Sequence, residues 1–238
     1  MGRNRSKEGA ARRAKRSLWG LVLAVAVVGW HQHARAQAVS PLGEPANLKI
    51  NLRVYNYGIS RALLSRAEGE ATGILNQAGL EAAWIDCPLS VAEREQYPPC
   101  QVPLSPTDFA IKILSAERAD RFSSRHEALG QALECAQNQV GCSAYIFYRG
   151  VLELARDGGA AEYQLLGHAL AHEIGHLLLG LNSHSPDGIM RAHWGHRDLQ
   201  TIAAGRLAFS KQQCERIRRE VSERNAVEQD RLARAQQQ

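Results

Sequence analysis

The chain contains the stretch Gly167-His-Ala-Leu-Ala-His-Glu-Ile-Gly-His-Leu-Leu-Leu-Gly180, which carries the pattern HExxH as His172, Glu173 and His176. Two histidines four residues apart on a helix project from the same face, so their ring nitrogens can converge on one metal ion. Apolar residues occupy nearly every other position, which predicts a deeply buried helix. Buried imidazole and carboxylate groups need a partner. The pattern therefore indicates either a metal site or a core helix whose histidines are hydrogen-bonded within the protein.

The sequence after this helix strengthens the metal interpretation. Gly180 is a typical helix end, and the chain continues Leu181-Asn-Ser-His184-Ser-Pro-Asp-Gly-Ile-Met190. This succession of HExxH, glycine, His-Ser and a tight turn ending in Ile-Met resembles the metzincin clan of zinc peptidases, and most of all its matrixin group. The resemblance implies that His184 is the third zinc ligand, that Glu173 is the catalytic base and that Met190 is the methionine of the turn beneath the metal.

The spacing departs from the family pattern. The family has HExxHxxGxxH, whereas this chain has HExxHxxxGxxxH, with one added residue on each side of the glycine. One extra helical residue rotates the chain after it by about 100°, so the loop from Gly180 to His184 must swing back to reach the metal. Asp187 and His193 are the alternatives for the third ligand. A more distant glutamate ligand, as in the gluzincin clan, would be Glu215.

The resemblance also implies an activity. It indicates a zinc metallopeptidase, most simply a metalloendopeptidase, that cleaves polypeptide substrates with a zinc-activated water and Glu173 as general base. The segment after the methionine forms a wall of the substrate pocket in the family, which makes Arg191, His193 and Trp194 candidates for substrate binding. Two alternatives share the site. One is a zinc hydrolase of a non-peptide amide or acyl bond, and the other is a non-catalytic exported zinc-binding domain.

The N-terminus predicts export. Basic residues are frequent from Met1 to Arg16, an apolar run of 13 residues extends from Leu18 to Trp30, and small residues offer cleavage after Ala36 or Ala38. Thirteen residues are too few to cross a bilayer comfortably. We therefore expect a secreted or periplasmic protein with no membrane span after cleavage. An uncleaved signal that anchors the chain in the membrane is the alternative.

The charge distribution follows from this leader. The first 36 residues carry eight of the 29 Lys and Arg residues and one of the 24 Asp and Glu residues, so the rest of the chain is slightly acidic. Residues 37–238 also lack a basic patch interleaved with aromatic residues, which argues against a nucleic-acid partner. We expect residues 37–47 to be a linker, residues 48–222 a metzincin-like catalytic domain and residues 223–238 a charged tail.

The five cysteines agree with export to an oxidising compartment. Neighbour pairing predicts the disulfides Cys87–Cys100 and Cys135–Cys142, although other connectivities are compatible with the sequence. Cys214 is then left over. It shares an apolar helical stripe with Ile217 and Val221, which favours a buried structural thiol.

The order of the predicted elements is that of an α/β domain. Alternation and β-branched content predict four strands, and helical spacing predicts three further helices. The expected strands are Leu48–Tyr57, Ala82–Asp86, Phe109–Leu114 and Ala144–Tyr148, and the expected helices are Ser60–Gln77, Leu199–Leu207 and Ser210–Val221. Asp108 is expected to be a turn residue.

The family resemblance adds an edge strand. It implies a zincin-like fold with a twisted, mostly parallel sheet, an antiparallel edge strand that binds substrate, a backing helix and the buried active-site helix. Leu129–Glu134 is the segment that would form this edge strand. Its composition leaves a second interpretation open, because Ala, Leu and Glu favour a helix over Arg125–Gln137.

Overall fold

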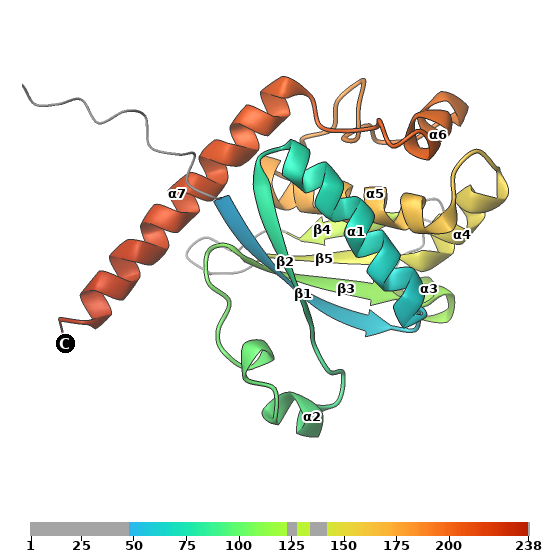
Figure 1. Ribbon diagram of the computed structural model, residues 1–238. Helices are drawn as coiled ribbons and strands as arrows, with labels where there is room; N and C mark the ends of the chain where they lie inside the picture. The colour runs from blue at the N-terminus through green and yellow to red at the C-terminus, as the bar shows by residue number, and fades with distance from the viewer. Residues whose placement is uncertain (1–47, 123–127, 134–141, 238) are drawn as a thin grey trace, which may run out of the picture. The chain divides into compact units, whose positions relative to one another are not determined.

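The five strands of the protein form one mixed sheet. The computed structural model describes residues 48–122, 128–133 and 142–237, so the predicted export signal, the linker and Cys135 lie outside the described residues. The sheet order is β2-β1-β3-β5-β4 (Figure 1). Its members are β1 (Leu48–Tyr57), β2 (Leu80–Asp86), β3 (Asp108–Leu114), β4 (Gly130–Leu133) and β5 (Cys142–Phe147).

The strand directions confirm the predicted fold class. Strands β1, β2, β3 and β5 run parallel, whereas β4 is antiparallel to β5 at the end of the sheet. Ala132 of β4 is opposite Ala144 of β5 in this pair. The edge strand therefore forms within the segment that the resemblance indicated, and the strand interpretation is confirmed over the helical one for Gly130–Leu133.

One face of the sheet is apolar because alternate residues of each strand point toward it. Ile50 and Leu52 of β1 and Ile111 of β3 are completely buried there. Helix α1 (Arg61–Gln77) and helix α5 (Glu162–Leu179) pack on this side. A Cβ on Gly167 of α5 would be 2.8 Å from the carbonyl oxygen of Ala67 in α1, so glycine permits the close approach of the two helices.

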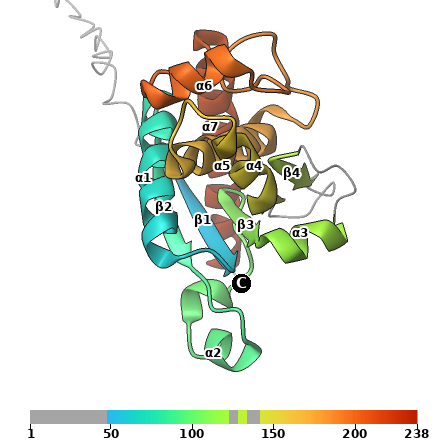
Figure 2. The same ribbon diagram turned by 90° about the vertical axis from the view of Figure 1, so that its right-hand side faces the viewer.

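The opposite side of the sheet carries a segment closed by a disulfide. It contains α2 (Val91–Glu95) and the short 3-10 helix η1 (Pro98–Cys100), and Figure 2 shows α2 on the side away from α6. The predicted Cys87–Cys100 bond is present, and Cys214 is free as expected. Cys135 is not described, so the second predicted disulfide stays a prediction.

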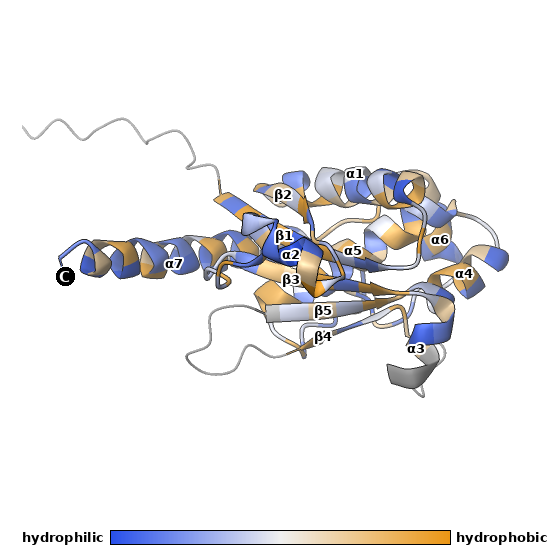
Figure 3. Cartoon of the chain, turned by 90° about the horizontal axis from the view of Figure 1, so that it is seen from below, coloured by the Kyte–Doolittle hydropathy of each residue, from blue (hydrophilic) through white to orange (hydrophobic). Residues whose placement is uncertain are grey.

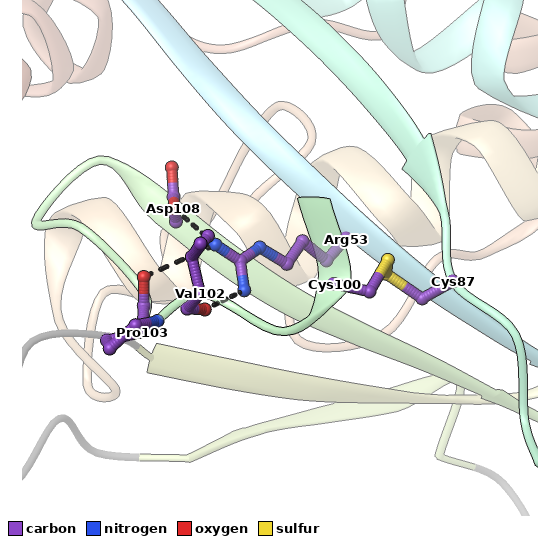
Figure 4. The surroundings of a disulfide bond; sticks show 6 residues. All are labelled: Arg53, Cys87, Cys100, Val102, Pro103 and Asp108. Atoms are coloured by element: carbon purple, nitrogen blue, oxygen red, sulfur yellow. Dashed lines mark hydrogen bonds and ion pairs between the residues drawn. A yellow bond between two sulfur atoms is a disulfide. The ribbon is translucent and has the colours of Figure 1, made fainter. Parts of the chain in front are cut away.

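Asp108 is not a turn residue. It begins β3, and its Oδ2 atom forms a buried ion pair of 2.9 Å with Nη2 of Arg53 (Figure 4). The Arg53 guanidinium also donates from Nη1 to the carbonyl oxygen of Val102. Because Arg53 and Asp108 are far apart in sequence, local pattern alone could not reveal that they pair.

The remaining helices are α3 (Ala116–Phe122), α4 (Tyr148–Arg156), α6 (His196–Ala203) and α7 (Lys211–Ala235). Three of them, α4, α6 and α7, contact α5, and α3 contacts α4 and β3. The sequence did not predict α4, and β5 ends one residue before the expected strand end because α4 begins at Tyr148. Ser210 caps α7 as predicted, since its Oγ accepts a hydrogen bond from the backbone N–H of Gln213.

Helix α7 continues through residues 223–235, so most of the expected charged tail is the exposed end of this helix. Figure 3 shows mainly hydrophilic residues along its outer part. Among the described residues, no helix combines the length and the apolar character needed to cross a membrane.

Candidate metal centre

Helix α5 carries the HExxH pattern through the centre of the protein. Every residue from Leu165 to Leu179 is buried, as the apolar sequence predicted. The helix ends at Gly180, which has a φ of 98°. Residues with a side chain rarely adopt this backbone conformation, so glycine allows the chain to leave the helix and turn back toward it.

Three imidazole rings meet beside this helix. Nε2 of His176 lies 3.0 Å from Nε2 of His172 and 3.1 Å from Nε2 of His184. Among the described residues these three histidines form the one group of His, Cys, Asp or Glu side chains whose donor atoms all lie within 4.8 Å of one another. His172 and His176 are buried, whereas His184 is exposed.

The hydrogen bonds of the rings orient the Nε2 atoms toward one another. Nδ1 of His172 lies 2.7 Å from the backbone carbonyl oxygen of Ile189, which can only accept, so Nδ1 carries the hydrogen. Nδ1 of His176 contacts the carbonyl oxygen of Gly180 at 3.3 Å and Oγ of Ser183 at 3.1 Å. In a neutral ring, a hydrogen on Nδ1 leaves Nε2 with a free lone pair.

Burial keeps the two helical histidines neutral. It lowers the pKa of His172 to about 4, against the opposing effect of the hydrogen bond to Ile189. Burial likewise lowers the pKa of His176. Neutral imidazole is the form that binds metal ions.

The arrangement fits a zinc ion. Zinc binds imidazole nitrogen at about 2.0–2.1 Å in tetrahedral geometry, which places two ligand nitrogens about 3.3 Å apart. The Nε2 separations of 3.0 and 3.1 Å are close to this value. Lone pairs that face one another repel unless a cation or a proton lies between them. The donor set is therefore suited to a small divalent cation, and three ligands leave a fourth position open.

The lengthened loop brings His184 back to the helix. Its turn is closed by a hydrogen bond of 2.9 Å from the N–H of Ser185 to the carbonyl oxygen of Met190. The loop is also attached to the rest of the protein, because Ile189 donates its N–H to Ala208 and Nε2 of Gln213 donates to Oγ of Ser185. These bonds hold the lengthened loop in the position that places His184 beside the helix.

Glu173 faces the edge strand. Its side chain is buried, and it accepts a hydrogen bond from the backbone of Ala132 in β4. Burial raises the pKa of Glu173 to about 8, and the bond from Ala132 partly opposes this. A cation beside the carboxylate would favour its charged form. The strand therefore positions the residue that the resemblance assigns as the base.

Met190 is completely buried, and its sulfur lies against α5. A Cβ on Gly175 would be 2.5 Å from Sδ of Met190 and 2.8 Å from Cε1 of Phe209. Glycine inside the HExxH pattern thus lets this side chain pack directly on the helix between the two histidines.

The other candidate ligands do not join the cluster. Asp187 and His193 are both exposed, and neither belongs to the group of three histidines. Glu215 is exposed on α7 and is also absent from that group. His168 is buried one turn before His172, where its Nδ1 atom lies 2.8 Å from the carbonyl oxygen of Gln164.

The three candidates for substrate binding differ in their environments. Arg191 forms an ion pair of 2.9 Å with Asp198 and is partly exposed. His193 is exposed. Trp194 is buried and points inward, with its Nε1 atom 3.2 Å from the carbonyl oxygen of Ile189.

A cavity of about 460 Å³ adjoins the cluster at the C-terminal end of α5. His176, Leu133 at the end of β4 and Arg219 of α7 are among the residues that line it. Cavities of about 300–1,000 Å³ are typical of binding sites for small molecules. Of the three clustered histidines, His176 is the one that lines this cavity.

Comparison with known proteins gives little further information. No family model matches the sequence, and no curated protein is similar to it. Among solved structures there is a distant likeness to archaemetzincin from Methanopyrus kandleri, with 15% identity, a TM-score of 0.40, and coverage of 77% of this chain and 99% of that one. None of these comparisons supports placement in the matrixin group. The interpretation of the site therefore depends on its own residues.

Proposed function

We propose that this chain is an exported zinc-dependent peptidase of the metzincin type. Its ligands would be His172, His176 and His184, and Glu173 would be the general base. The observation that carries this proposal is the convergence of three Nε2 atoms at 3.0 and 3.1 Å spacing, next to a buried glutamate. When bound, zinc supplies a Lewis acid that makes water acidic enough to react near neutral pH and stabilises negative charge on a carbonyl oxygen.

Glu173 would transfer the proton. Its carboxylate takes a proton from the attacking water at one oxygen and gives it to the nitrogen of the leaving amine. The hydrogen bond from Ala132 and the close contact with Gly130 hold this carboxylate in one place. Such restraint matters because misplacement by about 1 Å can cost about 100-fold in rate.

Strand β4 would hold the polypeptide. One edge of β4 pairs with β5, and its other edge pairs with no described strand. An extended peptide can add to such an edge through main-chain hydrogen bonds. Because β4 also contacts Glu173, a peptide bound along it would pass close to the base. This supports a peptide substrate over a small amide or ester, for which a free strand edge has no role.

The alternative of a purely structural zinc site is less well supported. Structural zinc sites are normally closed by four protein ligands. The group formed by described residues has three, and a buried carboxylate follows the first of them. Export is supported by the Cys87–Cys100 disulfide, which is compatible with an extracellular location.

The test combines metal analysis with a cleavage assay on casein. The purified full chain should contain one zinc ion per molecule and should cleave casein. Glu173→Gln should retain the zinc but lose at least about 100-fold in cleavage rate. Glu95→Gln is the matched control, because this glutamate is exposed on α2. Zinc binding without Glu173-dependent cleavage of casein would refute the peptidase, and absence of zinc would refute the metal site.

A further inference from the structure

Trp194 and His172 share one hydrogen-bond acceptor. The carbonyl oxygen of Ile189 accepts from Nδ1 of His172 at 2.7 Å and from Nε1 of Trp194 at 3.2 Å. A carbonyl oxygen has two lone pairs, so the two donors satisfy it completely. The carbonyl that orients the first histidine of the cluster is thus itself fixed by the indole.

The indole also packs against the histidine rings. Its ring centre lies 5.9 Å from that of His172, and the planes meet at 86°. The indole also contacts His168, with ring centres 6.2 Å apart and planes that meet at 89°. Both are edge-to-face contacts of the kind that aromatic rings favour. Trp194 therefore contacts two successive histidines of α5, and its contact with His172 restricts rotation of that ring.

Two effects of Trp194 act on one atom of the cluster. The satisfied Ile189 carbonyl keeps the hydrogen of His172 on Nδ1, and the perpendicular contact with the indole holds the plane of the ring. Together they direct the lone pair of Nε2 toward His176, whose Nε2 atom is 3.0 Å away. Groups that orient a metal-bound histidine in this way typically change metal affinity by about 10- to 100-fold when they are lost.

We infer that Trp194 is a positioning residue for His172 and not part of a substrate-pocket wall. This inference rests on the proposed zinc site. It also replaces the expectation from the sequence, which placed Trp194 against the substrate. The residue acts through the Ile189 carbonyl and through ring contact, and touches no reacting group.

The test compares two tryptophans in the full chain. Trp194→Phe keeps an aromatic ring but removes the N–H donor. Trp84→Phe is the matched control, because Trp84 also donates from Nε1 within the protein, to Oγ1 of Thr72 at 2.8 Å, and belongs to β2. We expect zinc affinity, measured by competition with a chelator, to fall about tenfold in Trp194→Phe. Trp84→Phe should leave it unchanged.

A second measurement does not require zinc. The ¹⁵N chemical shifts of the His172 ring report which nitrogen carries the hydrogen, and the His172→Asn variant identifies the resonances. In the metal-free chain the Nδ1–H form should dominate, and Trp194→Phe should increase the Nε2–H form. This readout separates the inference from the proposed function, because it remains informative if the chain binds no zinc or cleaves no protein.

Two results would overturn the inference. One is unchanged zinc affinity together with unchanged His172 shifts in Trp194→Phe. The other is an equal loss of affinity in both tryptophan variants, which would indicate general destabilisation. If Trp194→Phe does not fold, the Trp84→Phe chain can be made with 3-benzothienylalanine in place of tryptophan. This analogue has the shape of tryptophan without the N–H, and the same shifts then decide the question.

Discussion

Gly130 of the edge strand lies directly against Glu173 of the buried helix. A Cβ at position 130 would be 2.6 Å from both Cγ and Oε1 of the glutamate. No side chain larger than hydrogen fits there without moving the carboxylate. The contact joins the strand proposed to bind the peptide to the residue proposed to transfer the proton.

Gly130→Ala should therefore impair catalysis more than folding. The added methyl group must displace Glu173, and a shift of about 1 Å can reduce the rate about 100-fold. We expect kcat/KM for casein-derived peptides to fall by about that factor while the chain still binds zinc.

The matched control for Gly130→Ala is Gly73→Ala. A Cβ at Gly73, in α1, would meet nothing within 4 Å, and alanine favours helix over glycine by about 0.5–1 kcal/mol. This variant should retain full activity and equal or greater stability. Full activity of Gly130→Ala would show that the carboxylate position in the structure is not the catalytic one.

Gly175→Ala tests the packing beneath the cluster. The new methyl group would meet Sδ of Met190 and the ring of Phe209, both of which are buried. Overpacking of this kind costs about 1–3 kcal/mol. Urea denaturation should show a lower midpoint with an unchanged slope. Gly69→Ala, where the space is open, is the comparison, and equal midpoints for the two variants would contradict the tight contact.

The three candidates for the third ligand can be separated by metal analysis. His184→Ala should reduce zinc affinity by more than about 100-fold, because it removes a direct ligand. His193→Ala and Asp187→Ala should keep full zinc content, since both side chains are exposed and outside the cluster. Loss of zinc in either of these two, with retention in His184→Ala, would reassign the ligand.

Glu68 of α1 should make stability depend on pH. Burial, together with the charge of Asp86, raises its pKa to about 7 despite the opposing charge of Arg61. Its Oε1 atom is also buried without a hydrogen-bond partner in the structure. Because the folded state holds this proton more tightly than the unfolded state, its contribution to stability is present below pH 4.5 and is lost as the pH rises to 7.

Glu68→Gln removes the pH dependence of stability that comes from the raised pKa of Glu68. At pH 8 the variant should be more stable than the original chain by about 1 kcal/mol, a value reduced for the partial exposure of the side chain. At pH 4 the difference should be much smaller. Thermal unfolding at both pH values measures this difference in stability, and Glu95→Gln, at an exposed position, is the control. An equal effect of Glu68→Gln at both pH values would contradict the raised pKa.

Much of the fold was predictable because local pattern specifies local structure. The alternation of β1 gave its bounds, and Ser60 and Ser210 marked the starts of α1 and α7 through their capping hydrogen bonds. Helix α4 was not predicted, because Tyr148–Arg156 lacks a polar N-cap and comes directly after the strand. The edge strand needed the family resemblance, since its composition favours a helix and its pairing with β5 is a long-range contact.

The sequence by itself determined the chemistry available at the site: two histidines on one helical face, a carboxylate after the first, and a third histidine beyond a glycine. The tertiary structure decided which third side chain reaches them, because loop closure depends on bonds to Ala208 and Gln213 that no local pattern contains. It also decided that Gly130 and Trp194 support this site. Gly130 lies far from Glu173 in the sequence, and the Trp194 side chain points into the protein although the sequence placed it in a substrate pocket. Only packing in three dimensions brings both residues to the same helix.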